Sequence, residues 1–232
     1  RFRDKWADAV DADLFERRIA RAAPWTTAYH GLRDYGALSY TGRDYERYLG
    51  DPLMKVRQAI PEDPWGSVEF DLKLATEAKI DWWENYASIN MPLRGQHREP
   101  GPGAHGTTPI LSHSAAVAAL DQMMEGSHFR EEAVATRLVG GSALTEDEWV
   151  DPGYVALLTP VGERELSGMV RDWQAADPVV LRVLIPAGTP GLVLHYNEAL
   201  LARGLRYRIV AERAPSKIGG RKVRNVDVEV LS

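Results

Sequence analysis

The sequence predicts an α+β protein with N-terminal helices and two small, mostly antiparallel β-sheets. Residues 1–90 repeat apolar side chains at helical spacing, whereas short β-rich runs separated by turn residues follow from about residue 133. Helices and strands rarely alternate in this second part, which argues against a doubly wound parallel sheet. We therefore expect the helices to lie on one side of the two sheets.

The first 90 residues contain three segments with a helical pattern. In residues 1–23, five apolar side chains fall near one face: Phe2, Trp6, Val10, Leu14 and Ile19. Residues 42–60, which are broken near Gly50 and Pro52, and residues 69–89 follow the same rule. These segments predict three helices, the second of them interrupted.

A loop and a fourth helix separate these segments from the strands. Residues 95–109 hold too much Gly and Pro for a regular element, so we expect a loop. Residues 112–126 return to a helical pattern. Ser112 or Ser114 is the expected N-cap and Gly126 the expected stop.

The remaining chain predicts six strands and one helix. The strands are rich in β-branched residues and cover residues 132–139, 153–158, 178–186, 191–196, 206–212 and 223–231. The helix covers residues 161–176. A few strands with short connections suit antiparallel pairing.

Composition restricts the class of function. The chain has 232 residues, of which 44% are hydrophobic, so it can bury a sizeable core as one large domain or as one domain with an extension. A net charge of −5 argues against a surface built for nucleic acid. The absence of cysteine excludes a disulfide scaffold, a thiolate metal site and a cysteine nucleophile. No apolar run approaches the roughly 20 residues of a membrane span, so we expect no membrane partner.

Histidines provide the only metal-like spacing in the sequence. His97, His105 and His113 are evenly spaced, but most of them fall in a loop without a rigid frame or a neighbouring carboxylate. Solvated loop histidines explain the pattern better, and we predict no metal site. Neither common glycine-rich phosphate loop occurs either.

Two charged residues in β-rich runs have two interpretations each. Glu198, with Asn197, suits a solvated hairpin connection, and the alternative is an acidic residue of a site. Arg137 interrupts a β-run and is either a solvent-facing strand residue or a buried cation that awaits an anion such as phosphate. Local sequence leaves both choices open.

The order of motifs along the chain resembles the ADP-ribosyltransferase exoenzyme family. Its members often carry a helix that ends Y-x-x-I-N-x-x-L-R-G, and this chain has "YASINMPLRG", which matches at Tyr86, Ile89, Asn90, Leu93, Arg94 and Gly95. A Leu-Asp pair at Leu120–Asp121, the strand arginine Arg137 and the turn "DPGY" follow in the family's order. The stretch "NEALLARGLRYRIV" is similar to its acidic motif and tail. The resemblance covers about residues 80–232.

The chain departs from the family at two places. The Ser-Thr-Ser slot that usually follows the Gly-Tyr turn holds Ala156, Leu157 and Leu158. The first acidic or amide residue of the acidic motif is replaced by Tyr196, so that only the second and principal glutamate, Glu198, remains.

The resemblance implies a domain that binds NAD+ and cleaves its nicotinamide–ribose bond. Glu198 is then the catalytic carboxylate, since positive charge grows on the ribose in the transition state. Arg137 is the expected cation for the diphosphate, with Arg164 or Arg171 as weaker candidates. The Leu138 backbone would hold the nicotinamide amide and Tyr154 would offer a face for stacking. Tyr196 would meet the acceptor, which is a macromolecule or water.

A second class of function stays open at this point. The lost hydroxyls of the Ser-Thr-Ser slot also suit a catalytically silent domain with a structural or interaction role in a larger assembly, such as a phage particle or a toxin. The chain opens with Arg1 and has no signal-peptide pattern, so we expect a piece of a longer protein that is secreted, injected or virion-associated. Residues 1–79 would then be a helical region, as part of the same domain or as an extension, and residues 80–232 the ADP-ribosyltransferase-like domain.

Overall fold

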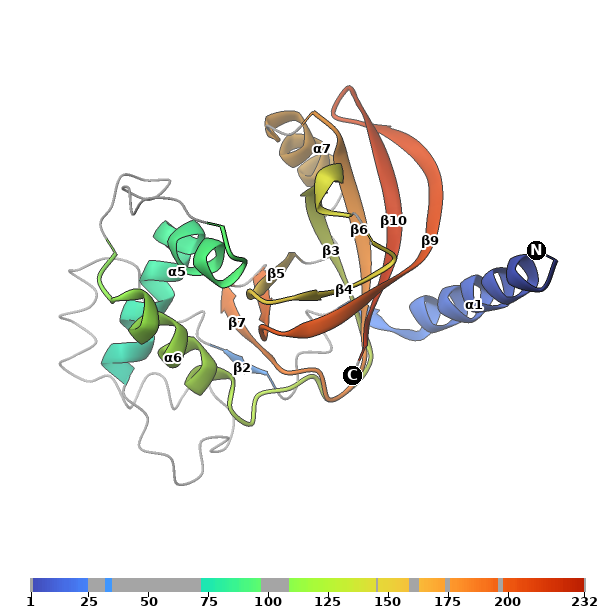
Figure 1. Ribbon diagram of the computed structural model, residues 1–232. Coiled ribbons are helices and arrows are strands. Elements are labelled where there is room, and N and C mark those ends of the chain that lie inside the picture. The colour runs from blue at the N-terminus through green and yellow to red at the C-terminus, as the bar shows by residue number, and fades with distance from the viewer. Residues whose placement is uncertain are drawn as a thin grey trace.

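The protein is a curled mixed β-sheet with helices around it (Figure 1). This computed structural model describes residues 2–24, 32–34, 72–96, 109–144, 146–158, 163–173, 176–195 and 198–231. The predicted helix at 42–60 and most of the predicted loop at 95–109 lie outside the described residues.

Four α-helices lie in the described part of the chain. They are α1 (Phe2–Arg21), α5 (Leu72–Leu93), α6 (His113–Met124) and α7 (Glu163–Asp172), and a 3-10 turn covers Gly141–Ala143. The prediction for α6 is confirmed, because the Ser112 side chain accepts a hydrogen bond from the Ala115 amide and caps the helix. None of the described helices combines the length and the apolar character that a membrane crossing needs.

Ten strands of the described residues form the sheet. They are β1 (Ala23–Pro24), β2 (Arg33–Asp34), β3 (Ala133–Gly140), β4 (Glu148–Asp151), β5 (Val155–Leu158), β6 (Pro178–Ile185), β7 (Gly191–His195), β8 (Glu198–Leu201), β9 (Leu205–Ile218) and β10 (Arg221–Leu231). Their order is β2-β7-β8-β5-β3-β6-β10-β9-β4, and β1 pairs with β3. The pairs β1–β3, β2–β7 and β6–β10 are parallel, and the other pairs are antiparallel.

The prediction of two sheets is wrong, because one sheet runs through all of these strands. Its two parts meet where β3 pairs with β5, and the register there has a single position, Thr136 opposite Leu158. β3 pairs with β6 along its whole length instead. A single pair lets the sheet curl sharply while the hydrogen-bonded order stays continuous.

The helices are not specifically N-terminal, and α7 matches the helix that the sequence predicted at residues 161–176. α7 follows β5, and the two-residue strands β1 and β2 lie among the N-terminal residues (Figure 1). Each short strand exists through a partner more than 100 residues away, since Ala23 pairs with Ala133 and Arg33 with Leu192. Local periodicity does not contain that information.

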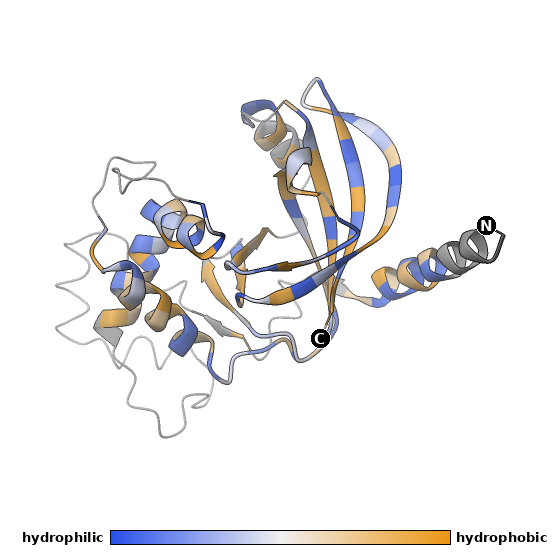
Figure 2. Cartoon of the chain, viewed as in Figure 1, coloured by the Kyte–Doolittle hydropathy of each residue, from blue (hydrophilic) through white to orange (hydrophobic). Residues whose placement is uncertain are grey.

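Three buried clusters hold the described part of the chain together. One fills the curl between β3, β5, β6, β8, β9 and β10, a second packs α5 and α6 against β5, β7 and β8, and a third packs α7 against β3, β6 and β10. Orange and blue residues alternate along β9 and β10 (Figure 2). In β10 both faces are buried, because the polar Asn225, Asp227 and Glu229 are covered as well as the valines between them.

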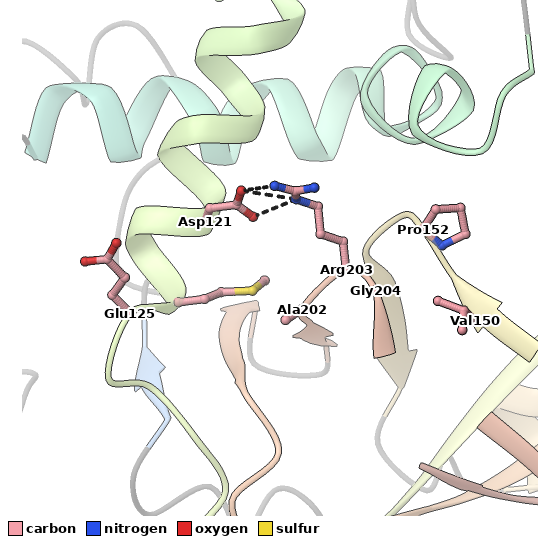
Figure 3. Close-up of a pocket in the computed structure, with 8 residues that line it drawn as sticks. Asp121, Glu125, Val150, Pro152, Ala202, Arg203 and Gly204 are labelled. Atoms are coloured by element: carbon pink, nitrogen blue, oxygen red, sulfur yellow. Dashed lines mark hydrogen bonds and ion pairs between the residues drawn. The ribbon is translucent and has the colours of Figure 1, made fainter. Parts of the chain in front are cut away.

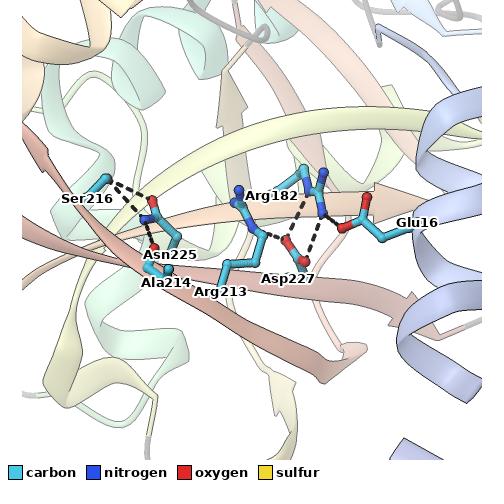
Figure 4. A network of polar contacts seen from close by, with 7 residues as sticks. All are labelled: Glu16, Arg182, Arg213, Ala214, Ser216, Asn225 and Asp227. Atoms are coloured by element: carbon cyan, nitrogen blue, oxygen red, sulfur yellow. Dashed lines mark hydrogen bonds and ion pairs between the residues drawn. The ribbon is translucent and has the colours of Figure 1, made fainter. Parts of the chain in front are cut away.

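The helix α1 uses a face that differs from the predicted one. Phe15 is buried, at 3% exposure, whereas the predicted Leu14 is 51% exposed. The sheet face beneath α1 is polar: Asp227 accepts hydrogen bonds from Arg182 and Arg213, and Arg182 also pairs with Glu16 of the helix (Figure 4). The ion pair of Glu16 and the buried ring of Phe15 therefore set the orientation of the helix. The apolar pattern of the sequence alone did not predict this orientation.

Candidate functional site

The end of α5 is clamped to the turn between β4 and β5. The Asn90 side chain accepts a hydrogen bond from the Tyr154 amide at 2.9 Å and donates one to the Tyr154 carbonyl at 3.0 Å. Arg94 donates to both carboxylate oxygens of Asp151, at 2.9 and 3.1 Å. Asn90 and Arg94 at the end of this helix therefore hold a turn that is distant in the sequence.

The clamp leaves no room for a side chain at Gly153. A Cβ atom there would lie 2.7 Å from the Asn90 amide oxygen and 3.1 Å from the Arg94 Nε. The Gly153 amide donates to Asp151 at 3.0 Å, which closes the turn. The segments "INMPLRG" and "DPGY" are therefore direct partners in the fold.

The clamp extends through Tyr154 to two further motifs. The Tyr154 hydroxyl donates to Asp121 at 2.7 Å, and Arg203 pairs with the same carboxylate at 2.7 Å. Burial, followed by the Asp121 carboxylate, raises the pKa of Tyr154 above its ordinary value. A continuous chain of hydrogen bonds thus joins α5, the β4–β5 turn, α6 and the segment after β8.

Arg137 lies at one end of this clamp. Its guanidinium is 3.8 Å from the Asp151 carboxylate, so that Arg94 and Arg137 share one carboxylate. Burial of the cation lowers the pKa of Arg137, and the charge of Asp151 opposes this shift. Two cations around one anion leave the cluster with a net positive charge.

A pocket of about 310 Å³ opens beside these two arginines, with Trp149 and Leu144 in its walls. Trp149 stacks on Tyr207, with ring centroids 5.3 Å apart. The Tyr207 hydroxyl is buried and makes no hydrogen bond with the described residues. Burial raises the pKa of Tyr207 and keeps its phenol neutral. The pocket combines positive charge with a flat aromatic wall, which suits an anion attached to a planar ring.

Glu198 is the first residue of β8, opposite Leu158 of β5. Its Oε1 accepts a hydrogen bond of 2.9 Å from the indole nitrogen of Trp82 on α5. The Trp82 side chain is 4% exposed and lies edge-on against Tyr154, with centroids 5.9 Å apart. A half-buried carboxylate is thus held between a strand start and a helix.

Arg137 and Glu198 do not line the same pocket. Glu198, Leu158 and Thr136 lie in one row across β8, β5 and β3. Arg137 follows Thr136 on β3, and because side chains alternate along a strand it points to the other face. The structure brings Arg137 together with Arg94 and Asp151, and it brings Glu198 together with Trp82.

Comparisons with known proteins find this fold in solved structures. No protein-family model matches the sequence, and no curated protein matches it. Plx2a, an ADP-ribosyltransferase toxin from Paenibacillus larvae, is 16% identical, with a TM-score of 0.52 over 82% of this chain and 96% of that chain. Vis toxin, an ADP-ribosyltransferase from Vibrio splendidus, is 16% identical, with a TM-score of 0.52 over 85% of this chain and 90% of that chain.

The chain has the fold of mono-ADP-ribosyltransferase toxins. The sequence-based resemblance to that family is therefore matched at the level of the fold. Within this toxin fold, the motifs that carried the resemblance meet in space, as the contacts of Asn90, Arg94, Asp121, Tyr154 and Arg203 show.

Tyr154 and Leu138, which were predicted to contact NAD+, are both packed in the core. Tyr154 is fully buried between α5 and α6, so its ring offers no free face for stacking. The Leu138 side chain packs beside α7 with Val170 and Val223, and its backbone lies in the β3–β6 ladder opposite Val180. A contact of Leu138 with a ligand would use its backbone, which is the contact that the family resemblance implies.

The structure describes only some of the other residues that the sequence predicted for the site. Arg164 belongs to α7, but its side chain lies outside the described residues, as does the whole of Tyr196. Of the three histidines, His97 and His105 lie outside the described residues, while the His113 ring is 3.1 Å from the Ile89 carbonyl. No group of three or more potential metal ligands occurs within the described ranges.

A second pocket, of about 520 Å³, lies beside the Asp121–Arg203 pair (Figure 3). Figure 3 shows the pair at the end of α6, with Pro152 and Val150 across the opening. The pair takes part in the clamp described above, which accounts for both charges.

Nothing in the sequence pointed to Trp82 as the hydrogen-bond partner of Glu198. It precedes Glu198 by 116 residues and looks like one of several aromatic core residues of its helix. A tryptophan has a donor to satisfy when it is buried, and this is the only signal that the sequence carried.

Proposed function

We propose that this domain binds NAD+ and cleaves its nicotinamide–ribose bond, transferring ADP-ribose to a macromolecule or to water. The observation that supports this most directly is the held carboxylate of Glu198 in a fold shared with ADP-ribosyltransferase toxins. The bond from ribose C1 to the nicotinamide nitrogen breaks, and its electron pair leaves with neutral nicotinamide. The acceptor then attacks C1 and loses a proton.

Glu198 acts on the charge that develops in this step. As the bond breaks, the ribose becomes oxocarbenium-like, and a fixed carboxylate beside it stabilises that positive charge. A half-buried position strengthens the interaction, because less water screens it than at an exposed site. The pyridinium of NAD+ leaves as neutral nicotinamide, and this step requires no metal.

The diphosphate of NAD+ is assigned to the positive cluster of Arg94 and Arg137. Arg137 is a partly buried cation at 3.8 Å from the Asp151 carboxylate that it shares with Arg94, so an incoming phosphate would find charge that Asp151 does not fully compensate. β3 and β5 pair at one position only, and we infer that the cofactor passes between the two faces where these strands separate. The Leu138 backbone would meet the nicotinamide amide, and Arg164 of α7 would be a further cation. Stacking of a ligand on Tyr154 would require its ring to leave the core between α5 and α6.

The acceptor is proposed to be something other than an arginine side chain. In the family that the sequence resembles, a Glu at the position of Tyr196 goes with arginine acceptors, and a tyrosine is neutral at pH 7. By contrast, the ADP-ribosyltransferase Vis was solved in complex with agmatine, whose guanidino group resembles that of an arginine side chain. Incubation of a lysate with tagged NAD+ should label residues other than arginine, or release nicotinamide by hydrolysis without labelling. Strong labelling of arginines would contradict this assignment.

A second candidate is a catalytically silent domain with a structural or interaction role in a larger assembly. Its support is the slot at Ala156, Leu157 and Leu158, which lacks hydroxyls and in which Leu157 is fully buried. Asn90, Arg94 and Asp151 are also already engaged in the clamp. A phage particle or a multidomain toxin would be the setting for such a domain.

One experiment separates the two candidates. Purified protein is incubated with NAD+, and released nicotinamide is measured for the wild type, for Glu198→Gln and for Glu131→Gln. Loss of the carboxylate should reduce the rate by about 1,000-fold, in the range of a lost transition-state contact. Glu131 is exposed and outside the candidate site, so its variant should match the wild type. A wild-type protein that releases no nicotinamide would support the silent domain.

A further inference from the structure

Trp82 holds the carboxylate of Glu198 in an orientation that the neighbouring strand no longer provides. Leu158 lies directly opposite Glu198, and Ala156 lies two residues before it on the same face. Neither side chain carries a hydrogen-bond donor. The indole nitrogen of Trp82 reaches the carboxylate from the other side, at 2.9 Å.

The indole is itself fixed from two directions. Trp82 is almost fully buried and meets Tyr154 edge-on and Tyr86 at a tilt, with centroids at 5.9 and 6.3 Å. Tyr154 is fixed in turn, because Asn90 binds its backbone and Asp121 accepts from its hydroxyl. The donor therefore reaches Glu198 with little rotational freedom, at small entropic cost.

An indole N–H has the chemistry that this position requires. It donates and never accepts, so it pairs with a carboxylate in one way only. A hydrogen bond from a fixed donor to a charged acceptor is stronger than a bond between neutral groups. Such a bond selects one rotamer of the glutamate, and a catalytic carboxylate depends on being held in its productive geometry before the substrate arrives.

We propose that Trp82 is a positioning residue for Glu198, and that its indole N–H takes the place of a strand hydroxyl in the cleavage of NAD+. This inference rests on the proposed function, and it concerns the rate of the chemical step. Trp82 does not touch the substrate. Its loss should lower kcat and leave the binding of NAD+ nearly unchanged.

The test compares Trp82→Phe with a matched control. Phenylalanine keeps an aromatic ring and removes the donor. The control is Trp173→Phe, because the Trp173 indole nitrogen is also buried but makes no hydrogen bond with the described residues. We expect kcat for nicotinamide release to fall by about 10- to 100-fold in Trp82→Phe, as for a lost hydrogen bond to a charged group, with KM for NAD+ within about threefold. Trp173→Phe should keep the wild-type kcat.

A rescue variant separates positioning from packing. Leu158→Ser places a hydroxyl directly across the strand pair from Glu198, at a Cβ separation of about 5 Å. In the Trp82→Phe background it should recover at least about fivefold of the lost kcat, as expected for one restored hydrogen bond. Leu158→Ala in the same background should recover nothing. Equal effects of Ser and Ala would contradict the positioning role.

A measurement on the folded protein keeps the test independent of turnover. In a ¹⁵N–¹H spectrum, the Trp82 indole signal, assigned through Trp82→Phe, should move when Glu198 is changed to Gln, and the Trp173 signal should stay in place. An unmoved Trp82 signal, or a Trp82→Phe variant with the kcat of the wild type, overturns the positioning role alone. A wild-type protein that releases no nicotinamide overturns the proposed function and this role together.

Discussion

At the scale of single residues, two asparagines of α5 have opposite surroundings. Asn90 is 4% exposed, and its amide forms two hydrogen bonds with the Tyr154 backbone. Asn85 is 2% exposed, has non-helical backbone angles, and its amide has no hydrogen-bond partner within the described residues. Burial alone does not tell these residues apart, but their partners do.

This contrast predicts different effects on stability. Asn90→Ala should lower the free energy of unfolding by about 2–4 kcal/mol, because it leaves buried backbone groups of Tyr154 without their side-chain partner. Asn85→Ala should stay within about 1 kcal/mol of the wild type, since it removes an amide that is buried without a bond. Urea unfolding followed by circular dichroism measures both. A larger loss for Asn85→Ala than for Asn90→Ala would contradict the role of the clamp.

At the scale of elements, the turn between β4 and β5 depends on Gly153. Its missing side chain leaves space for Asn90 and Arg94, whose atoms cannot move aside because both are held by hydrogen bonds. Gly153→Ala should therefore cost about 1–3 kcal/mol, as overpacked sites do. Gly168 in α7 has open space where a Cβ atom would lie, so Gly168→Ala should stabilise the protein by about 0.5–1 kcal/mol. Thermal unfolding of the two variants gives the comparison.

The helix α1 should respond to salt more than the sheet does. Arg18 pairs with Glu132 and Glu229, and Glu16 pairs with Arg182. In each ion pair at least one of the two side chains is partly exposed to solvent. If each pair contributes about 0.5 kcal/mol, screening of all three should speed amide exchange in the second half of α1 by about tenfold. Raising the salt from about 0.1 M to about 1 M shortens the screening length from about 10 Å to about 3 Å.

Hydrogen exchange with mass spectrometry tests the docking of α1, with Glu229→Gln as the matched variant. That variant should loosen the helix at low salt, whereas Glu212→Gln, whose partner Arg224 lies on the sheet, should not. If amide exchange in α1 changed with neither salt nor Glu229→Gln, these ion pairs would not hold the helix on the sheet.

Elements with a strong local pattern were predictable from the sequence. β6 and β10 are long and rich in valine, and α6 has a serine cap, so each lies close to its predicted range. β4 was not predicted, because "EWVD" has four residues, two of them charged, and it forms only by pairing with β9. The choice of Phe15 over Leu14 depended on the charges of the sheet beneath it.

The candidate site was predictable to a similar degree. The sequence pointed to Arg137 and Glu198 through the order of motifs. The fold places Arg137 on the strand predicted at residues 132–139, whereas Glu198 begins β8, a strand that was not among those predicted. The sequence did not show that Arg137 shares Asp151 with Arg94, or that Glu198 bonds to Trp82, since these contacts span 14 to 116 residues. Such pairings depend on the curl of the sheet, which only the tertiary structure defines.

At the scale of the whole molecule, the two arginines and the glutamate divide the proposed work between binding and chemistry. Arg94 and Arg137 lie beside one pocket, and Glu198 lies on the other face of the strand row. If the diphosphate of NAD+ binds to these arginines, most of the binding energy comes from the pocket beside Arg94 and Arg137. Glu198 would contribute mainly in the transition state, where charge has developed on the ribose.

This division predicts a pattern of melting temperatures. NAD+ at about 100 times its Kd should stabilise the wild type by about 2.7 kcal/mol, which corresponds to a rise in Tm of about 5–10 °C for a chain of this size. Glu198→Gln should keep most of this rise, because it binds the cofactor without cleaving it. Arg137→Gln should lose most of the rise at the same NAD+ concentration. Since Arg137→Gln also leaves Asp151 with one partner fewer, the comparison is made against each variant's own Tm without NAD+. If millimolar NAD+ does not raise the Tm of the wild type, the proposal that the domain binds NAD+ is wrong. If Arg137→Gln keeps the rise in Tm, cations other than Arg137 bind the diphosphate.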